Sequence, residues 1–290
     1  MNKNYILIDS NEGRFGNQLY PIFVALTYYE HNKDKFHEKI YFKNIFLEGL
    51  GRYRLEPSMF AQLPESVKTI LDINLENYQR IEENSTSVSY LDYPIDLPND
   101  FNNNLLIHNY CQMANKIDVN VIRKYFECPK EIKNKIFELY GDISDAVCLH
   151  VRRGDYVTSP YFYLLSKEYI ETLIEKYFKN KKIIYVSDSL QWGKINLGHI
   201  PNIIFADKCE KEERAIMDFY TLTLTQYNIC SPSSFCMAAA MLNPNNNIYV
   251  PYPYYKYEPW NKDAELNIIP SYAHKIDYKL GEDKKYIYPK

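Results

Sequence analysis

Short apolar runs alternate along the chain with segments that repeat hydrophobic residues every three or four positions. The runs are too short to show a helical period and are typical of buried strands. Leu19, Ile22, Phe23 and Leu26, in contrast, follow the i, i+3, i+4, i+7 pattern of an amphipathic helix. The apolar runs predict strands at Tyr5–Asp9, Leu105–Tyr110, Ala146–Leu149, Lys182–Ser187, Ile203–Phe205, Tyr227–Cys230 and Ile248–Val250. In the second half, the patterns predict helices at Lys130–Tyr140, Ser166–Phe178, Ser189–Lys194 and Lys211–Thr225, and one that ends at Leu242.

Strands that alternate with helices indicate an α/β fold with parallel, doubly wound sheets. The length of 290 residues is enough for two domains of about 140 residues each, although a single large domain is the alternative. We expect an N-terminal α/β domain over residues 1–128, a second domain over 129–250, and a Pro- and Tyr-rich tail over 251–290 that packs across both. The region from Lys39 to Asn104 is predicted to be irregular, and loops of that length usually contact a partner or substrate.

A loop with two glycines, Glu12–Gln18, separates the first strand from the first helix. Free backbone amides at the start of that helix would suit an anionic or hydroxyl-rich ligand. The glycine spacing fits neither the dinucleotide fingerprint nor the P-loop, which argues against a nicotinamide or P-loop site. A tight turn without a ligand explains the same glycines.

The segment His150–Tyr156 carries the strongest chemical signal, because Arg152 and Arg153 follow directly on a buried strand. Ligands of open α/β sheets collect outside the carboxyl ends of the strands. Guanidinium groups keep their charge and bind two oxygens at once, so the pair indicates an anionic ligand such as phosphate. The alternative is a pair of surface arginines beside an ordinary Gly154-Asp155 turn.

Two further strand exits carry polar groups, Ser187-Asp188 and Ser231–Phe235. In a parallel sheet these exits share one edge with the arginines, so we expect all three to line one crevice. Serine hydroxyls and a helix N-terminus suit phosphate or ribose, and a carboxylate suits paired donors such as a guanine edge. Helix N-capping by Asp188 and Ser233 is the alternative explanation.

The amino-acid composition limits the classes of molecule that the protein is expected to bind. The net charge of −3 gives no global attraction to nucleic acid; we expect no nucleic-acid partner and at most peripheral membrane association. The six cysteines show no metal-binding spacing. Because neither a signal peptide nor a long apolar run is present, we expect a cytoplasmic protein. The 29 tyrosines suit a carbohydrate surface, but a bias toward Asn, Lys, Tyr and Ile explains them as well.

Taken together, the motifs resemble those of the α-1,2-fucosyltransferase family and, more distantly, the α-1,6- and protein O-fucosyltransferases. The resemblance rests on Gly13–Gln18, His150–Tyr156, Ser187-Asp188 with Trp192, and Ser233–Phe235. It implies a GT-B-like fold, with two Rossmann-like domains and a cleft between them. It also implies inverting transfer of L-fucose from GDP-fucose to a glycan hydroxyl, such as the 2-OH of a terminal galactose. The resemblance further implies that no metal or other cofactor is required, in keeping with the absence of an Asp-x-Asp that would hold a metal against a diphosphate.

The resemblance also implies roles for individual residues. Arg152 would contact the β-phosphate with support from Arg153, and Asp188 would meet guanine. The remaining donor contacts are then expected from Gly16, Asn17, His150, Ser233, Ser234 and Phe235. Asp155 is a candidate for the base that deprotonates the acceptor, or it braces the arginine loop, whereas Asn17 can orient a substrate but cannot ionise. The alternative functions are a GDP-sugar transferase with another sugar or linkage, and a carbohydrate- or nucleotide-binding protein without turnover.

Overall fold

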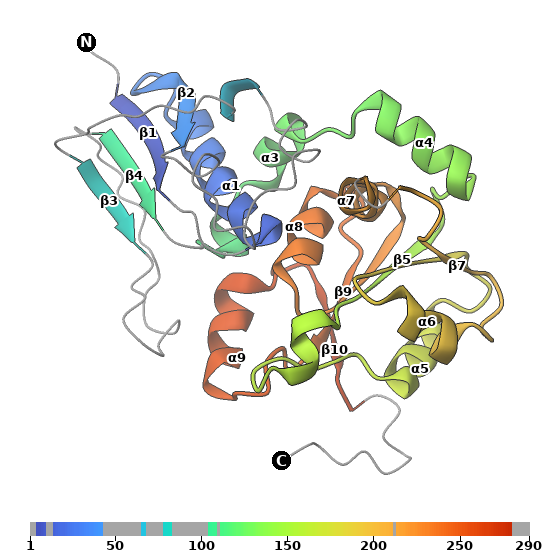
Figure 1. Cartoon of the computed structure of the whole chain (residues 1–290). Helices are drawn as coiled ribbons and strands as arrows, with labels where there is room; N and C mark the ends of the chain where they lie inside the picture. Colours follow the sequence, from blue (N-terminus) through green and yellow to red (C-terminus); the bar gives the residue numbers. More distant parts are fainter. Residues whose placement is uncertain are drawn as a thin grey trace. The chain divides into compact units, whose positions relative to one another are not determined.

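The computed structural model describes residues 4–9, 14–42, 65–67, 78–82, 104–108, 111–210 and 213–279 (Figure 1). The chain divides into two compact units. The first comprises Met1–Glu127 together with Glu265–Pro270, and the second comprises Cys128–Ala264 and Ser271–Lys290. The segment that we expected to act as a tail therefore contributes residues to both units.

The first unit contains a parallel four-stranded sheet in the order β2-β1-β4-β3. Helix α1 follows β1 and is apolar nearly all round, so that thirteen of its seventeen residues are buried. Pro21 inside α1 has no N–H to donate to the carbonyl of Asn17. The described elements of this unit are β1 (Asn4–Asp9), α1 (Phe15–His31), β2 (Phe36–Phe42), a 3₁₀ turn (Glu65–Val67), β3 (Tyr78–Glu82), β4 (Asn104–His108), a second 3₁₀ turn (Ala114–Lys116) and α3 (Val119–Tyr125).

Two expectations for this unit need correction. The region from Lys39 to Asn104 was predicted to be irregular, but it contains the greater part of β2 and all of β3. The predicted glycine loop is shorter than expected, because α1 begins at Phe15 and takes Gly16 and Asn17 into its first turn. The N–H of Gln18 donates to the carbonyl of Arg14, which closes that turn. Gly13 lies outside the described residues.

The second unit contains a parallel six-stranded sheet in the order β10-β9-β8-β5-β6-β7. The chain moves outward from β5 through β6 to β7, and then returns to place β8, β9 and β10 on the other side of β5. This is the strand order of a Rossmann domain, with its topological switch point between β5 and β8. The strands are β5 (Val147–Val151), β6 (Ile183–Ser187), β7 (Ile203–Phe205), β8 (Tyr227–Cys230), β9 (Ile248–Tyr252) and β10 (His274–Asp277). The helices are α4 (Lys130–Tyr140), α5 (Lys167–Tyr177), α6 (Leu190–Leu197), α7 (Arg214–Leu224), α8 (Ser234–Leu242) and α9 (Pro259–Asp263), and a π-helical turn follows at Ala264–Ile268.

Strand β5 lies in the middle of this sheet, and all of its residues are buried. Val147, Leu149 and Val151 join the core beneath α5, and burial of side chains of this kind contributes about 1.5–3 kcal/mol each. Successive strand residues point to opposite faces, so Cys148 and His150 turn toward the side of α8. Apart from His150, β5 is apolar, as expected for a strand covered on both faces.

Ser166 caps α5 as its sequence position predicts, because its hydroxyl oxygen accepts the N–H of Tyr169 at 3.1 Å. The predicted loop between Tyr156 and Leu165 begins within a 3₁₀ helix, Gly154–Thr158. The tail also differs from expectation, since β10 pairs with β9 as a sixth strand. Its sequence, His-Lys-Ile-Asp, contains a single apolar residue, so the hydrophobic pattern gives no signal for it.

Candidate functional site

Three strand ends meet at the switch point of the second sheet. Val151 at the end of β5 pairs with Ser187 at the end of β6. On the other side of β5, His150 pairs with Cys230 at the end of β8. The segments that follow these three strands therefore leave the sheet at the same edge, where open α/β sheets bind ligands.

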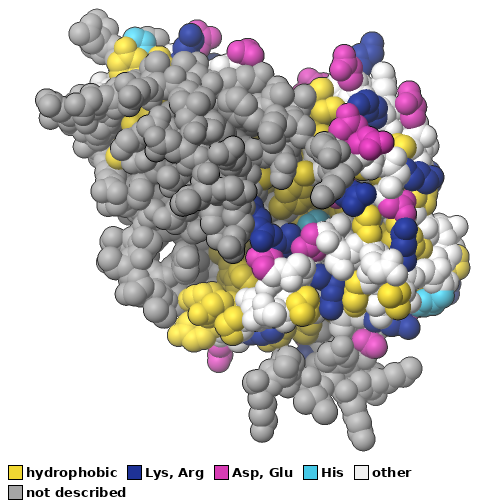
Figure 2. Space-filling model, viewed as in Figure 1, with side chains coloured by type: hydrophobic (Ala, Val, Ile, Leu, Met, Phe, Trp, Pro, Cys, Tyr) yellow, Lys and Arg dark blue, Asp and Glu magenta, His cyan; other side chains and the backbone are white. Residues whose placement is uncertain are grey.

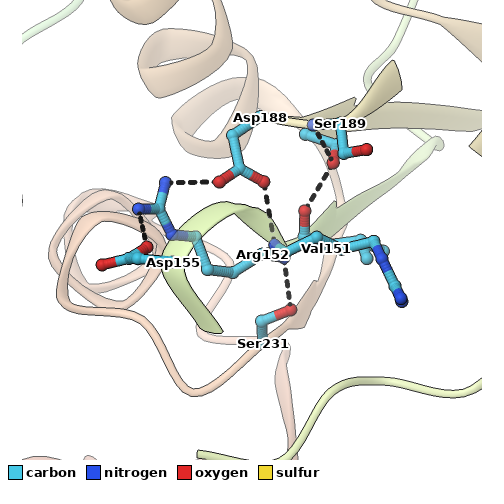
Figure 3. A network of polar contacts seen from close by, with 8 residues as sticks. Val151, Arg152, Asp155, Asp188, Ser189 and Ser231 are labelled. Carbon is cyan, nitrogen blue, oxygen red and sulfur yellow. Dashed lines mark hydrogen bonds and ion pairs between the residues drawn. The ribbon is translucent and has the colours of Figure 1, made fainter. Parts of the chain in front are cut away.

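Arg152 leaves this edge with its guanidinium group held by two carboxylates (Figure 3). Its Nη1 lies 2.7 Å from Asp188 Oδ2, and its Nη2 pairs with Asp155 Oδ1. The guanidinium carbon lies 5.5 Å from the centre of the Tyr156 ring. The side chain is only 17% exposed. The two carboxylates therefore hold the Arg152 guanidinium in a fixed orientation at the strand ends, where it is only partly accessible to water.

Asp188 ties the arginine loop to the end of β6. One of its oxygens bonds Arg152, and the other accepts the backbone N–H of Arg153 at 2.8 Å. A Cβ atom at Gly154 would overlap Asp188 Oδ2, so this close approach requires glycine at position 154. The guanidinium of Arg153 turns away and stacks 4.2 Å from the centre of the Trp192 ring on α6. The Arg-Arg-Gly segment thus fits closely around one carboxylate.

Two serine hydroxyls fix the exit of β5 from both sides. Ser187 donates to the carbonyl of Val151 at 2.6 Å and accepts the N–H of Ser189 at 2.9 Å. Ser231 donates to the carbonyl of His150 at 3.0 Å. It also accepts the N–H of Arg152 at 2.9 Å (Figure 3). Each hydroxyl satisfies a backbone group that has left the strand ladder. The sequence marks both serines at strand exits, but it does not reveal that they bond to β5.

His150 is buried, with an exposed fraction of 5%. Its ring stacks on Phe235 at 5.8 Å, and Phe235 in turn meets the edge of Phe219. Burial lowers the pKa of His150 to about 4, so the ring is neutral at pH 7. Its Nδ1 has no hydrogen-bond partner among the described residues. His150 therefore adds no positive charge to the site and packs behind it.

The other predicted nucleotide contacts begin α8. Ser233 is buried at the N-cap position, and its side chain makes no capping hydrogen bond within the described structure. Asp188 bonds to Arg153 and caps no helix, and α6 begins after Ser189. N-capping thus explains neither Asp188 nor Ser233. Ser234 and Phe235 occupy the first turn of α8 and are partly buried.

Gly16 and Asn17 belong to the first unit, whereas the other predicted site residues belong to the second. Gly16 is buried in the first turn of α1. The side-chain oxygen of Asn17 accepts a hydrogen bond of 3.0 Å from Gln112 Nε2. Gln112 therefore fixes the amide of Asn17 with its oxygen toward Gln112 and its NH₂ group turned away.

Neither a metal cluster nor a membrane-spanning helix is found within the part of the chain that the structure describes. No group of three or more His, Cys, Asp or Glu side chains in these ranges is arranged to hold a metal ion. None of the described helices combines the length and apolar character needed to cross a membrane.

Comparison with known proteins gives a family and a fold. The model of Glycosyl transferase family 11 matches residues 68–271. The O-antigen biosynthesis glycosyltransferase WbnK of Escherichia coli is 27% identical over 157 residues, and the match covers 49% of this chain and 51% of WbnK. The chain therefore spans about half the length of this curated relative.

Among solved structures, the fucosyltransferase NodZ from Bradyrhizobium superposes with a TM-score of 0.56 at 17% identity, over 84% of this chain and 95% of NodZ. A NodZ α-1,6-fucosyltransferase crystal soaked with GDP-fucose gives a TM-score of 0.55 at 17% identity, over 83% and 94% of the two chains. At this identity the likeness shows the fold alone, and it confirms the predicted GT-B-like fold class.

Proposed function

The chain belongs to Glycosyl transferase family 11, and from this premise we propose that it transfers L-fucose from GDP-fucose to a hydroxyl group of a glycan. The NodZ structure soaked with GDP-fucose supports the choice of donor. The role of WbnK in O-antigen biosynthesis supports a glycan acceptor. The motifs of the α-1,2-fucosyltransferases favour the 2-OH of a terminal galactose as the attacking group, with inversion at the anomeric carbon.

The observation that carries this proposal is the position of Arg152. A guanidinium at the switch point of a Rossmann-like sheet, held by Asp155 and Asp188, is preorganised for an anionic group. A diphosphate supplies the paired oxygens that a guanidinium binds most strongly. The N-terminus of α8 adds backbone N–H groups at the neighbouring strand end.

The proposed reaction breaks the bond between the anomeric carbon of fucose and the β-phosphate oxygen of GDP. The acceptor oxygen forms the new bond on the opposite face of the sugar and loses its proton to a base, and GDP departs with the bonding electron pair. Negative charge then grows on the β-phosphate, where Arg152 stabilises it. We assign the neutralising role to the arginine, so that no divalent metal is needed.

The contacts of Asp188 favour a positioning role in addition to the guanine contact that the resemblance implies. Both of its carboxylate oxygens are engaged by the arginine loop, one by a guanidinium and one by a backbone N–H. Ser233, Ser234 and Phe235 at the start of α8 are the remaining candidates for nucleotide contacts in this unit. Gly16 and Asn17 are proposed to meet the fucose.

Asp155 has two candidate roles, which one variant separates. Its ion pair with Arg152 favours bracing of the arginine over removal of the acceptor proton. Asp155→Asn retains a hydrogen-bonding oxygen but cannot take a proton. Loss of transfer by a factor of about 100 or more with unchanged GDP affinity indicates general-base catalysis, which contributes about 10²–10⁴-fold. A weaker affinity for GDP with a smaller loss of rate indicates the bracing role.

The function is tested with purified protein in excess EDTA. Calorimetry measures GDP binding, and release of GDP is followed from GDP-fucose and, in parallel, from GDP-mannose, with galactose-terminated oligosaccharides as acceptors. We expect GDP to bind and fucose to be transferred without added metal. Faster turnover of GDP-mannose indicates a transferase with a different donor. Tight GDP binding without turnover on any acceptor would contradict the proposed reaction and indicate a binding protein.

A further inference from the structure

Beside the arginine loop, six aromatic side chains of the second unit form a cluster, which we call the aromatic platform. Two segments supply them, one after β5 and one after β9. Its members are Tyr156, Tyr161, Phe162, Tyr255, Tyr257 and Trp260. No residue role assigned above involves this cluster.

The two segments are fixed to each other by backbone contacts. Phe162 and Tyr255 form an antiparallel bridge. The N–H of Lys256 donates to the carbonyl of Tyr161 at 2.8 Å, and its ammonium group donates to the carbonyl of Ser159 at 3.2 Å. The side chain of Asn261 bonds both the N–H and the carbonyl of Tyr255, at 2.8 and 2.9 Å. The platform is therefore formed in advance of any ligand.

The rings support one another and yet remain partly open to solvent. Tyr161 stacks on Trp260 with ring centres 4.8 Å apart, and Tyr257 meets the same indole edge-on at 5.3 Å. Tyr161 is 46% exposed and Tyr257 is 41% exposed. Two of the seven large hydrophobic residues that are exposed in the described structure thus contact the same indole ring. Concentrated apolar surface of this kind marks an interaction site.

The platform is continuous with the arginine site. Tyr156 stacks on Phe162 with ring centres 4.0 Å apart and planes at 9° to each other. The Arg152 guanidinium also lies near the Tyr156 ring, 5.5 Å from its centre. Figure 2 shows hydrophobic side chains gathered over α9 and the neighbouring segment, with basic and acidic side chains next to them. A ligand on the platform therefore lies beside the proposed diphosphate.

The chemistry of the platform fits a neutral, hydroxylated ligand. Tyrosine and tryptophan combine an apolar ring face, which packs against the C–H face of a sugar ring, with a polar group that bonds hydroxyls. Glu258 and Lys262, both exposed, carry opposite charges, whereas a surface that binds anionic lipid needs an excess of Lys and Arg.

We propose that the aromatic platform binds the acceptor glycan of the fucosyl transfer, with the terminal galactose or the next sugar stacked on Tyr161 and Tyr257. This inference rests on the proposed function and adds to it the surface that selects the acceptor. The platform raises affinity for the acceptor and takes no part in donor binding.

The test compares Tyr161→Ala and Tyr257→Ala with Tyr177→Ala, in which a tyrosine of similar exposure, 43%, is removed from α5. Lactose and N-acetyllactosamine are the acceptor probes. We expect each platform variant to raise the acceptor KM about tenfold, which is the loss of one aromatic stacking contact of about 1.4 kcal/mol. GDP affinity and acceptor-independent hydrolysis of GDP-fucose stay within twofold of wild type, as does every property of Tyr177→Ala. Saturation-transfer NMR, in which magnetisation passes from protein to bound sugar, should give a weaker lactose signal in both platform variants than in wild type.

Different results would exclude fucosyl transfer and acceptor binding by the platform. A wild-type protein that binds no GDP and turns over no GDP-fucose contradicts the proposed function. Unchanged acceptor KM and unchanged saturation transfer in both platform variants, with GDP binding intact, overturn the platform. Absence of lactose and N-acetyllactosamine binding to wild type overturns it as well. Dissociation of a wild-type dimer, or loss of vesicle binding, in the variants without any change in acceptor KM would assign the surface to self-association or to a membrane instead.

Discussion

Arg152 is held at the end of β5 by contacts of several different kinds. Asp155 and Asp188 contact its guanidinium, Ser231 accepts its backbone N–H, and Gly154 leaves room for the Asp188 carboxylate. From the sequence, the two adjacent arginines are predicted to follow directly on the end of a strand. The sequence does not predict that Asp188 contacts the pair, because 35 residues separate Asp188 from Arg153 and only the register between β5 and β6 brings them together.

A substitution at Gly154 tests whether the Asp188 carboxylate sets the position of Arg152. In Gly154→Ala the added methyl group would overlap Asp188 Oδ2, so the carboxylate must move and release Arg152. We expect GDP affinity measured by calorimetry to fall about tenfold, equivalent to about 1.4 kcal/mol, while circular dichroism shows a folded protein. Ser189→Ala is the control, because the Ser189 side chain makes no capping bond to α6. Equal GDP affinity in Gly154→Ala and wild type would show that the carboxylate does not set the arginine's position.

His150 predicts a dependence of stability on pH. Its pKa falls from 6.5 to about 4 on burial, so between these values the unfolded chain binds a proton that the folded protein does not. The free energy of unfolding therefore falls as pH is lowered from 6.5 toward 4, by about 3 kcal/mol from this residue. His150→Phe should remove that part of the slope in urea titrations at pH 4.5 and 7.

Wild type has to be compared with His150→Phe because Asp218 changes the free energy of unfolding with pH in the opposite direction to His150. Burial raises the pKa of Asp218 well above its ordinary value, so its contribution to stability decreases as pH rises above about 4. The difference between wild type and His150→Phe cancels this contribution. His274→Gln, on the exposed edge strand, serves as a control for loss of a histidine. An identical slope in wild type and His150→Phe would mean that His150 is not held neutral in the folded protein.

At the scale of elements, the central strands are predictable from the apolar runs, and of the four described edge strands only β7 is. The apolar runs correctly locate β1, β5, β6 and β8, all of which have neighbours on both sides. The three strands that the pattern does not predict, β2, β3 and β10, all lie at sheet edges. Edge strands pair on one side only and carry charged residues that oppose aggregation. The sequences of β2, β3 and β10, such as His-Glu-Lys within β2, therefore lack the apolar runs that identify the other strands.

The packing of α6 on β6 gives a prediction at this scale. A Cβ atom at Gly193 would overlap the buried ring of Tyr185 on β6, so Gly193→Ala must push the helix away from the sheet. We expect the free energy of unfolding in urea to fall by about 1–3 kcal/mol, as is usual for overpacking. Ile195→Ala removes an exposed side chain, 71% accessible, from the same helix and should change stability by about 0.5 kcal/mol or less. Equal free energies of unfolding for Gly193→Ala and wild type would show that α6 can move away from β6 without loss of stability.

At the scale of the whole molecule, the sequence predicts an α/β chain whose proposed donor contacts come from two separate parts. The alternation of strands and helices indicates the fold class, and the order of strands follows from the structure, because sequence patterns do not specify which strands pair. The assignment of Gly16 and Asn17 to the fucose remains a prediction. It depends on residues that belong to the first unit, while the diphosphate contacts belong to the second.

The variant Asn17→Ala tests whether the first unit contacts the fucose while the second unit contacts the diphosphate. If Asn17 meets the fucose and not the nucleotide, the variant binds GDP within twofold of wild type, because the proposed GDP contacts are untouched. Its rate of fucose transfer should fall by about tenfold or more, as expected when one hydrogen bond of about 1.4 kcal/mol to the transition state is lost. A loss of GDP affinity equal to the loss of rate would place Asn17 at the nucleotide instead.

We propose that Arg152 stabilises the leaving diphosphate without a metal. The most direct measurement is the initial rate of fucose transfer from GDP-fucose in excess EDTA by wild type, Arg152→Ala and the surface control Lys176→Ala. We predict that wild type and Lys176→Ala transfer fucose at similar rates, while folded Arg152→Ala loses a factor of about 10²–10³, as is usual for one preorganised charge contact. A folded Arg152→Ala protein that retains transfer within threefold of wild type would contradict the account.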